Sequence, residues 1–515
     1  MERQRYPIGL QSFKEIREGG YVYVDKTEYI YQLLRGSKYY FLSRPRRFGK
    51  SLFLSTLKCF FENKRELFEG LDITVHSEIE WTERPVIHID FNGADYSKEE
   101  SLVERIDAQL EKYEAIYTIG KSSLSISGRF DALIQEAHRK TGQQVAVLID
   151  EYDKPILDTL HLEDRAGMHR DQLRGFYSVL KSNDDHLKLV LLTGITKFGH
   201  LNIFSGLNNL FDISMADEYS AICGITRQEL HANFDPGVEN LAARLKCSKE
   251  EAYDRLKQNY DGYHFSEECQ DIYNPFSLLN CLQLETIRGF WFQTGTSSFL
   301  ARYFQTHELR ITDFDDIRCS AESIMGVDAV PTDPIPLLYQ SGYLTIKGYD
   351  PEFNFFTLGF PNREVKQGFY DGLLSLYAGP KSPTVTRDLV LAVRNGDTDR
   401  FMDCLQGLFS SISYDMRLED ERNFQNVVLT IFRLMGLYTK EEDRTPKGRI
   451  DITVVTQDYI YIIELKRDST PEAALRQIKE KGYADKYRND PRQIIELGIN
   501  FSTKEREITG WAVSN

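Results

Sequence analysis

The first 200 residues alternate between short apolar runs and longer segments whose apolar positions have helical spacing. Four apolar runs predict buried strands, at Tyr39–Leu42, Pro85–Phe91, Val145–Asp150 and Leu187–Thr193. A short aromatic run at Tyr21–Val24 predicts a further strand. Because helical segments separate the main strands, the pattern is typical of a parallel sheet with crossover helices.

The pattern changes from about Asp217 onward to helices joined by aromatic turns. Within this region, Leu337–Leu358 predicts a helix, a turn and two strands. A helix that ends in a hairpin is typical of a winged-helix module, and a general α+β packing unit fits nearly as well. Both alternatives stay open at this point.

A linker is predicted at Ala378–Pro383, because three of its six residues are glycine or proline. Beyond the linker, the pattern predicts helices to about Gly436 and then strands. A helix at Pro471–Lys486 and two final strands follow. The C-terminal part therefore has its own α/β pattern.

The composition is that of an ordinary globular protein, with 41% hydrophobic and 27% charged residues. At roughly 100–200 residues per domain, 515 residues predict about two to four domains. The net charge of −15 excludes a general binder of polyanions, so any contact with nucleic acid requires a local basic patch.

The seven cysteines are scattered without CxxC spacing, which argues against a disulfide framework and against a zinc site. No apolar segment follows the first residues, and no apolar run approaches the roughly 18 residues that span a bilayer. We therefore expect a cytoplasmic protein with no membrane partner.

A phosphate-binding loop is predicted between the first strand and the helix that follows it. The segment ends in Gly49-Lys50-Ser51, the second half of the GxxxxGK[ST] motif. Lys50 would reach the β- and γ-phosphates, and the Ser51 hydroxyl would bind Mg²⁺. The residues predicted to bind nucleotide in this loop are Arg47, Phe48, Gly49, Lys50 and Ser51.

The loop departs from the motif where Arg44 replaces the first glycine. We expect a steric cost there if Arg44 has to adopt a positive φ. On the tripeptide alone, a basic surface loop before a helix is an equally good interpretation.

A second motif strengthens the nucleotide interpretation. The strand Val145–Ile149 ends in Asp150-Glu151, the Walker B pattern. Asp150 would hold Mg²⁺, and Glu151 would polarise the attacking water as a catalytic residue. The next strand ends near Thr193 and Thr196, either of which could sense the γ-phosphate, although a threonine at the end of a strand is common.

A third motif predicts a metal-dependent nuclease core. Asp451 is followed after twelve residues by Glu464-Leu465-Lys466, the D…(D/E)xK pattern. In an antiparallel hairpin the two acids would be adjacent, and Glu464 and Lys466 would project from one face. Two carboxylates suit Mg²⁺ or Mn²⁺, and Lys466 would orient water or stabilise developing charge.

Residues around this motif agree with the interpretation. Glu421, on a preceding predicted helix, is a candidate metal ligand, and Gln477 on the following helix could hold the lysine or a phosphate. Twelve basic and eleven acidic residues between Lys440 and Arg492 give this segment a charge of +1, against −15 overall. Such a surface permits phosphate contact. An acid and Glu-x-Lys on an exposed hairpin are nevertheless frequent without any function.

The chain resembles the bacterial AAA-ATPase-like family, whose members commonly carry a C-terminal PD-(D/E)XK nuclease-like domain. Nearly the whole chain shares the resemblance, and the form Arg-Pro-Arg-Arg-Phe-Gly-Lys-Ser is specific to it. The segments that carry it are 6–9, 21–27, 41–51, 148–153, 199–210 and 260–263. In that family Arg44 is usual, so the missing glycine weighs less against ATP binding.

The family is similar to regulatory AAA+ and STAND-type ATPases, which implies a helical lid and a winged helix after the P-loop domain. We therefore predict an α/β protein of three domains. They are an AAA-ATPase-like P-loop domain at 1–215, a lid with a winged-helix-like region at 216–380, and a restriction-endonuclease-like domain at 387–515.

The leading functional hypothesis is an ATPase that regulates a Mg²⁺- or Mn²⁺-dependent nuclease domain acting on nucleic acid, with DNA the favoured partner. The alternative is a signalling or scaffold ATPase whose nuclease-like domain is inactive and only binds nucleic acid or protein. A P-loop kinase or transferase is a weaker third interpretation. Assembly into a homo-oligomer is left open.

Overall fold

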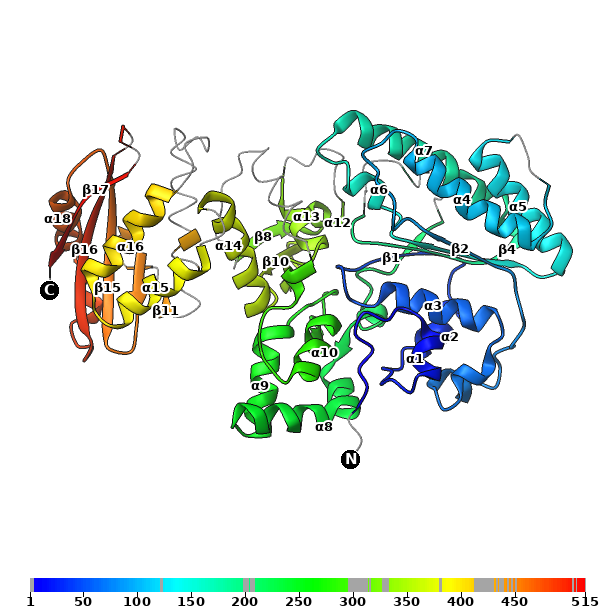
Figure 1. Cartoon of the computed structure of the whole chain (residues 1–515), viewed down its shortest axis with the longest axis horizontal. Helices are drawn as coiled ribbons and strands as arrows, with labels where there is room; N and C mark the ends of the chain where they lie inside the picture. The colour runs from blue at the N-terminus through cyan, green and yellow to red at the C-terminus, as the bar shows by residue number, and fades with distance from the viewer. Residues whose placement is uncertain are drawn as a thin grey trace. The chain divides into compact units, whose positions relative to one another are not determined.

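The computed structural model describes most of the chain (Figure 1). The residues outside the description are 1–3, 121–123, 198–202, 204–208, 295–313, 315, 327–332, 379–381, 412–429, 432–433, 435–439, 442–443, 446–447, 450–451, 503, 506 and 515. Contacts divide the chain into two compact units, the first Met1–Thr294 with Asp313–Val365 and the second Gly295–Thr312 with Lys366–Asn515. The three predicted domains have other bounds and stay a prediction.

The first unit contains the parallel sheet that the sequence predicts. Five strands pair in the order β2-β3-β4-β1-β5, all parallel. Their bounds are β1 Tyr39–Ser43, β2 Val86–Asp90, β3 Val145–Asp150, β4 Leu187–Gly194 and β5 Phe211–Asp212. The four strands predicted from apolar runs are thus confirmed, and the short edge strand β5 was not predicted.

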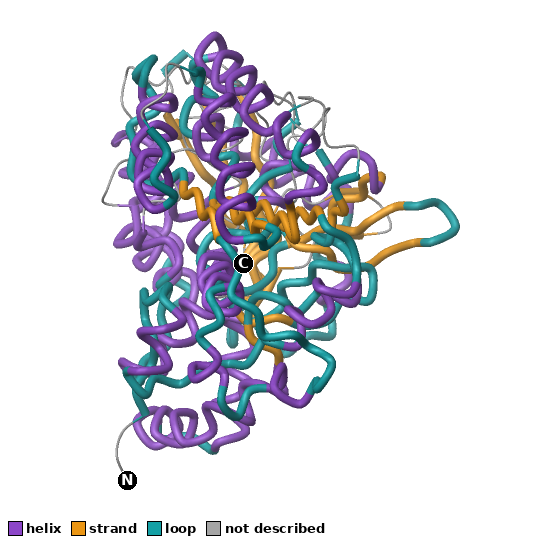
Figure 2. The backbone as a smooth tube through the Cα atoms, turned by 90° about the vertical axis from the view of Figure 1, so that its right-hand side faces the viewer, coloured by secondary structure: helices purple, strands orange, loops and turns teal. Residues whose placement is uncertain are grey.

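Helices cover both faces of this sheet (Figure 2). In Figure 1, α4, α5 and α7 lie above the sheet and α1, α2 and α3 below it. Burial on both faces explains why every residue of β3 is buried and why the strand is apolar almost throughout. The bounds are α1 Phe13–Glu18, α2 Glu28–Arg35, α3 Lys50–Phe61, α4 Ser101–Ile116, α5 Ile126–Thr141, α6 Lys154–Leu157 and α7 Glu163–Ser182, with 3₁₀ turns η1 Arg65–Phe68, η2 Asp72–Val75 and η3 Asp184–His186.

The strand predicted at Tyr21–Val24 is wrong, because this segment is irregular. Its alternating apolar side chains serve packing instead of a strand ladder. Val22 and Val24 pack against an apolar cluster that includes Phe234 and Leu278. The hydroxyl of Tyr23 lies 3.5 Å from the Thr56 hydroxyl on α3.

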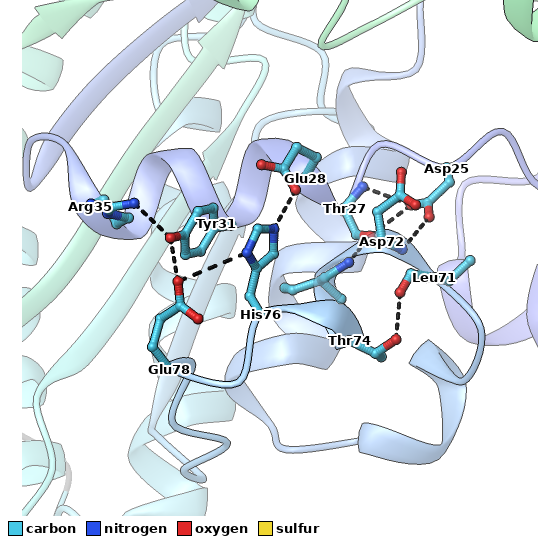
Figure 3. A network of polar contacts seen from close by, with 11 residues as sticks. Asp25, Thr27, Glu28, Tyr31, Arg35, Leu71, Asp72, Thr74, His76 and Glu78 are labelled. Atoms are coloured by element: carbon cyan, nitrogen blue, oxygen red, sulfur yellow. Dashed lines mark hydrogen bonds and ion pairs between the residues drawn. The ribbon is translucent and has the colours of Figure 1, made fainter.

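A polar network ties the start of α2 to η2 (Figure 3). Asp25 accepts from the Thr27 amide at 2.8 Å and hydroxyl at 2.7 Å, and its other oxygen accepts from the Asp72 amide at 2.7 Å. Farther along α2, Glu28 lies 2.6 Å from the His76 ring, which stacks on Tyr31 with centroids 3.7 Å apart. These contacts fix the segment 71–78 against α2.

A helical region follows the sheet within the first unit. Its apolar core includes Leu230, Leu256, Tyr260 and Leu278, all fully buried. The bounds are η4 Asp217–Tyr219, β6 Ile225–Thr226, α8 Arg227–Leu245, α9 Lys249–Tyr260, β7 Ile272–Tyr273, α10 Pro275–Leu284 and η5 Trp291–Thr294. We refer to 217–294 as the lid region.

The predicted helix and hairpin at 337–358 are present. Helix α13 spans Ile335–Gln340, and strands β9 Thr345–Asp350 and β10 Phe355–Gly359 form the hairpin. A third strand, β8 Ile317–Ser320, pairs with β10 and is followed by α12 Ala321–Met325. The winged-helix assignment stays a prediction.

The second unit is built on a mixed sheet in the order β11-β14-β15-β16-β17. Strands β15 and β16 are parallel, and the other neighbours are antiparallel. The bounds are α15 Ser382–Arg394, α16 Thr398–Ser411, β11 Lys440–Glu441, β12 Arg444–Thr445, β13 Gly448–Arg449, β14 Ile452–Val455, β15 Tyr459–Arg467, α18 Pro471–Lys481, η6 Asp485–Tyr487, β16 Gln493–Ser502 and β17 Glu507–Ser514, while α14, Arg363–Ala378, begins in the first unit. Residues 379–381 of the predicted linker lie outside the described residues.

Helix α18 is shorter than the predicted 471–486. It ends at Lys481 because Gly482, with φ 60°, takes a left-handed conformation and its amide bonds back to the carbonyls of Ile478 and Lys479.

Among the described helices of both units, none is long and apolar enough to cross a membrane.

We predict that Asp25→Ala destabilises the first unit by about 1–3 kcal/mol, because the substitution leaves the amides of Thr27 and Asp72 without their acceptor. Urea unfolding followed by tryptophan fluorescence measures the change. Glu18→Ala, which removes an exposed carboxylate on α1, is the control and should change the free energy of unfolding by less than about 0.5 kcal/mol. Equal effects of the two substitutions would contradict the prediction.

A second prediction concerns Asp261 in the lid region. Burial raises the pKa of Asp261 to about 6, so the folded protein binds a proton there that the unfolded chain has released above about pH 4. The stability of wild type relative to Asp261→Asn should therefore fall as the pH rises from about 4 to 6, by on the order of 2–3 kcal/mol. Urea unfolding of both proteins across this range tests the sign, and a constant difference would refute it.

Candidate functional site

The loop between β1 and α3 folds over the side chain of Lys50. The Lys50 ammonium donates to the carbonyl oxygens of Arg44 and Pro45, at 2.9 and 3.2 Å. Only 4% of the lysine is exposed. The loop backbone therefore closes around a positive charge at the start of α3, and Ser51, the next residue, stays partly exposed.

Two residues of the loop adopt a left-handed backbone, Arg47 with φ 72° and Gly49 with φ 101°. Arg44 does not, so the steric cost expected at that position is absent. Gly49 is the N-cap of α3 and offers no side chain to the helix end. A Cβ on Gly49 would meet no atom within 4 Å. Open space therefore borders the first amides of α3, where anions are favoured.

Arg44 is an anchor of the loop. Its guanidinium is 1% exposed and donates to the carbonyl oxygens of Ser43 at 2.9 Å, Ser214 at 2.6 Å and Tyr219 at 3.0 Å. It also lies 4.2 Å from the centroid of the Phe265 ring. Burial lowers the pKa of Arg44 from its usual range. The residue that replaces the motif glycine thus ties the loop to the chain after β5.

The side chains of Arg47 and Phe48 also contact the lid region. The Arg47 guanidinium lies 4.5 Å from the centroid of Phe276. The Phe48 ring packs edge-on against Tyr263 and Phe265, with centroids 4.8 and 5.3 Å away. Aromatic residues of the lid region therefore pack directly against the loop. The nucleotide contacts predicted for Arg47 and Phe48 stay predictions.

The predicted acids stand at the carboxyl end of β3, beside the end of β4. Asp150 is 3% exposed and accepts from the Thr193 hydroxyl at 2.8 Å. Glu151 has a left-handed φ of 53°, which is uncommon outside glycine and typical of functional sites. Burial raises the pKa of Glu151, and the nearby Lys50 charge opposes that rise. Because β4 lies between β1 and β3, the sheet brings Lys50, Asp150, Glu151 and Thr193 to one edge.

Asp153 was missed by the sequence analysis. It is fully buried, and one oxygen accepts from the Ile195 amide at 2.9 Å and from the Thr196 amide and hydroxyl at 2.6 and 2.7 Å. Burial raises the pKa of Asp153, and the bonds from Thr196 lower it. These hydrogen bonds engage Thr196, the alternative candidate for sensing the γ-phosphate. The sequence did offer a signal for Asp153, because it is a third acidic residue that closely follows Asp150 and Glu151.

A small apolar cavity of about 90 Å³ lies beside Gly49. The chain before β1, the helix α3 and the start of the lid region all contribute to its wall. Apolar residues of the wall include Val22, Val24, Leu52, Phe53, Ile222 and Ile225. The open space at the start of α3 therefore lies next to an apolar cavity.

A second polar group lies in the second unit. Glu464 on β15 is 2% exposed, and its Oε1 lies 3.1 Å from the Lys466 ammonium. Lys466 also donates to Gln477 Oε1 at 2.6 Å, and the Gln477 amide donates to Glu464. The lysine, the glutamate and the glutamine of α18 therefore form a closed triangle, and Glu464 and Lys466 share one face of β15 as the period-two argument predicts.

The other predicted ligands of this site, Asp451 and Glu421, lie outside the described residues. Ile452 pairs with Ile463, the antiparallel register on which the predicted pairing of the two acids depends. Within the described part of the chain, no three acidic, histidine or cysteine side chains converge as metal ligands would.

Comparison with known proteins adds to this geometry. A family model described as predicted AAA-ATPase matches residues 7–204, and one described as PD-(D/E)XK nuclease superfamily matches residues 419–511. Over 535 residues the chain is 37% identical to a protein of Azotobacter chroococcum mcd 1 described as the uncharacterized protein in the vnfD 5' region, with 100% of both chains covered. The chain therefore belongs to the AAA-ATPase-like family whose members join a predicted AAA-ATPase domain to a C-terminal domain of the PD-(D/E)XK nuclease superfamily.

Proposed function

We propose that the chain binds and hydrolyses ATP at the first site and thereby regulates a metal-dependent nuclease site in the second unit that acts on nucleic acid, with DNA the favoured substrate. The observation that carries the proposal is the buried Lys50 ammonium at the open N-terminus of α3, with Asp150 and Glu151 at the same edge of the sheet.

The donor set fits a magnesium nucleotide. The α3 amides and Lys50 would hold the phosphates, and the Ser51 hydroxyl and the Asp150 carboxylate would hold Mg²⁺, with Thr193 orienting Asp150. When bound, Mg²⁺ supplies charge neutralisation on the phosphate oxygens. The apolar cavity beside Gly49 offers a wall for the base.

In the reaction, the oxygen of a water bonds to the γ-phosphorus while the bond from that phosphorus to the β–γ bridging oxygen breaks, and ADP leaves with the bridging oxygen. Glu151 takes a proton from the water. Burial raises the pKa of Glu151, which makes its carboxylate a better base than an exposed one.

The second site supports phosphodiester hydrolysis by a similar argument. Glu464, with Asp451 and Glu421 as further proposed ligands, would hold Mg²⁺ or Mn²⁺, which supplies Lewis acidity when bound. Lys466, held by Gln477, would orient the attacking water and stabilise charge on the phosphoryl oxygens. Water adds to phosphorus, one ester oxygen leaves, and the proton lost by the water is available to that oxygen.

Regulation is proposed from the contacts between loop and lid region. Phe48 and Arg47 pack on Tyr263 and Phe276, so a change in loop shape on nucleotide binding acts on the lid region directly. At the end of β4, the Lys197 amide donates to Gln340 of α13 at 2.7 Å, which links the predicted sensor strand to the winged-helix-like segment. These segments precede the nuclease unit along the chain.

The alternative is a signalling or scaffold ATPase whose second unit is inactive and only binds nucleic acid or protein. One observation favours it: Glu464 is almost fully buried and bonded to both Lys466 and Gln477. Metal binding without cleavage would support this alternative.

We predict that Lys50→Ala weakens ATP binding by about 1.5–3 kcal/mol, because it removes a charge-assisted phosphate contact. Glu151→Gln should bind ATP normally and lose on the order of 10²-fold or more in turnover. Fluorescence titration and phosphate release measure the two effects. Lys58→Ala, a partly exposed lysine on the same helix, is the matched control. If Lys50→Ala binds ATP like wild type, the phosphate-loop assignment fails.

For the second site, Asp451→Ala and Glu464→Ala should each abolish Mg²⁺- or Mn²⁺-dependent cleavage, whereas Lys466→Ala should keep metal binding and lose the chemistry. A Mn²⁺ titration followed by melting temperature, beside cleavage assays on single- and double-stranded DNA and RNA, separates binding from cleavage. Glu480→Ala, an exposed acid on α18, is the control. Absence of both a metal-induced shift and cleavage in wild type would sink the nuclease proposal.

A further inference from the structure

The three arginines of the loop have different surroundings. Arg44 is buried and bonded to carbonyl oxygens, including that of Ser214. Arg47 is stacked on Phe276. These two guanidinium groups are therefore engaged by the protein itself, and only Arg46 is left to be explained.

Arg46 is half-buried, yet within the described part of the chain it makes no hydrogen bond or ion pair. A guanidinium carries five N–H donors, so those of Arg46 are available to a ligand or to water. Burial raises the pKa of Glu151 and of Tyr343, and the positive charge of Arg46 is near enough to oppose that rise in both groups. The charge of Arg46 is therefore felt at Glu151, which directly follows β3.

The loop backbone places Arg46 between two phosphate-binding features. The carbonyls of Arg44 and Pro45, just before it, lie against the Lys50 ammonium, and Gly49, three residues after it, opens α3. A phosphate chain along the α3 amides with its last phosphate near Lys50 would bring that phosphate between Arg46 and Glu151. Glu151 is the residue to which we assign activation of water.

We propose that Arg46 donates hydrogen bonds to the γ-phosphate of ATP and stabilises the charge on the phosphoryl group during transfer. The arginine that stabilises the transferring phosphoryl group thus comes from the same chain and not from a partner subunit. This inference rests on the proposed ATPase function. Bond making, bond breaking and the transfer of a proton to Glu151 are unchanged, because Arg46 keeps its own protons throughout.

The proposal differs from a positioning role, in which Arg46 would only orient Glu151 or the loop. A contact with the γ-phosphate affects nucleotides that carry one and leaves ADP binding alone. A positioning role changes turnover without changing the ratio of the two affinities. Nucleotide affinities measured without turnover therefore distinguish the two roles.

The experiment compares full-length wild type, Arg46→Ala, Arg46→Lys and Arg139→Ala in calorimetric titrations with Mg²⁺ plus ADP, and with Mg²⁺ plus the ATP analogue whose β–γ bridge is NH. Arg139, an exposed arginine on α5, is the matched control. Arg46→Ala should lose roughly 10–100-fold in affinity for the analogue and less than about threefold for ADP, and Arg46→Lys should lose less. ATP turnover of Arg46→Ala should fall by on the order of 10²-fold or more.

Equal losses of affinity for ADP and for the analogue in Arg46→Ala, or no loss for either, would overturn the Arg46 assignment. The ATPase proposal would still hold in that case if wild type binds and hydrolyses ATP. If wild type binds neither nucleotide, the ATPase proposal fails and the Arg46 assignment fails with it. Melting temperatures of all variants test whether a difference in nucleotide affinity comes from unfolding.

Discussion

The architecture of the first site depends on the buried guanidinium of Arg44. Taking an isolated charge out of water costs several kcal/mol, and here carbonyl oxygens of three residues and the face of Phe265 replace the lost water. Because those carbonyls belong to the end of β1 and to the chain after β5, satisfying the charge fixes the start of the loop relative to the sheet. The start of the loop that surrounds Lys50 is thereby held by the protein itself, whereas the later residues Arg47 and Phe48 contact the lid region.

Much of the fold could be predicted from local patterns. The residues Val145–Asp150 are buried throughout, and a continuous apolar run is a direct sign of such a strand. The strand predicted at Tyr21–Val24 is wrong because alternating apolar residues also suit an irregular segment that packs on a core, and none of the described strands pairs with this segment. The edge strand Phe211–Asp212 has two residues and carries too little pattern to be seen.

The sites divide in the same way. Lys50, Asp150 and Glu464 could be proposed as site residues because their chemistry is tied to short spacings, and the placement of a helix after the strand suggested the Gln477 contact with Lys466. The roles of Arg44 and Asp153 could not be predicted, because most of their hydrogen-bond partners are backbone groups. For Arg44 the farthest of the three carbonyls, that of Tyr219, lies 175 residues away along the chain, where no side-chain pattern marks it. Tertiary structure therefore decides which of the loop's arginines is structural.

The edge-on packing of Phe48 against Tyr263 and Phe265 has a consequence for how the loop and the lid region tolerate substitution. These rings belong to segments more than 200 residues apart, yet each fills space that the others leave, so a smaller ring at one position opens a cavity that only a larger neighbour could refill. Substitutions at the three positions are therefore expected to be energetically coupled and not additive. A change in the size of one ring should be tolerated best when a second ring of the group changes to compensate for it.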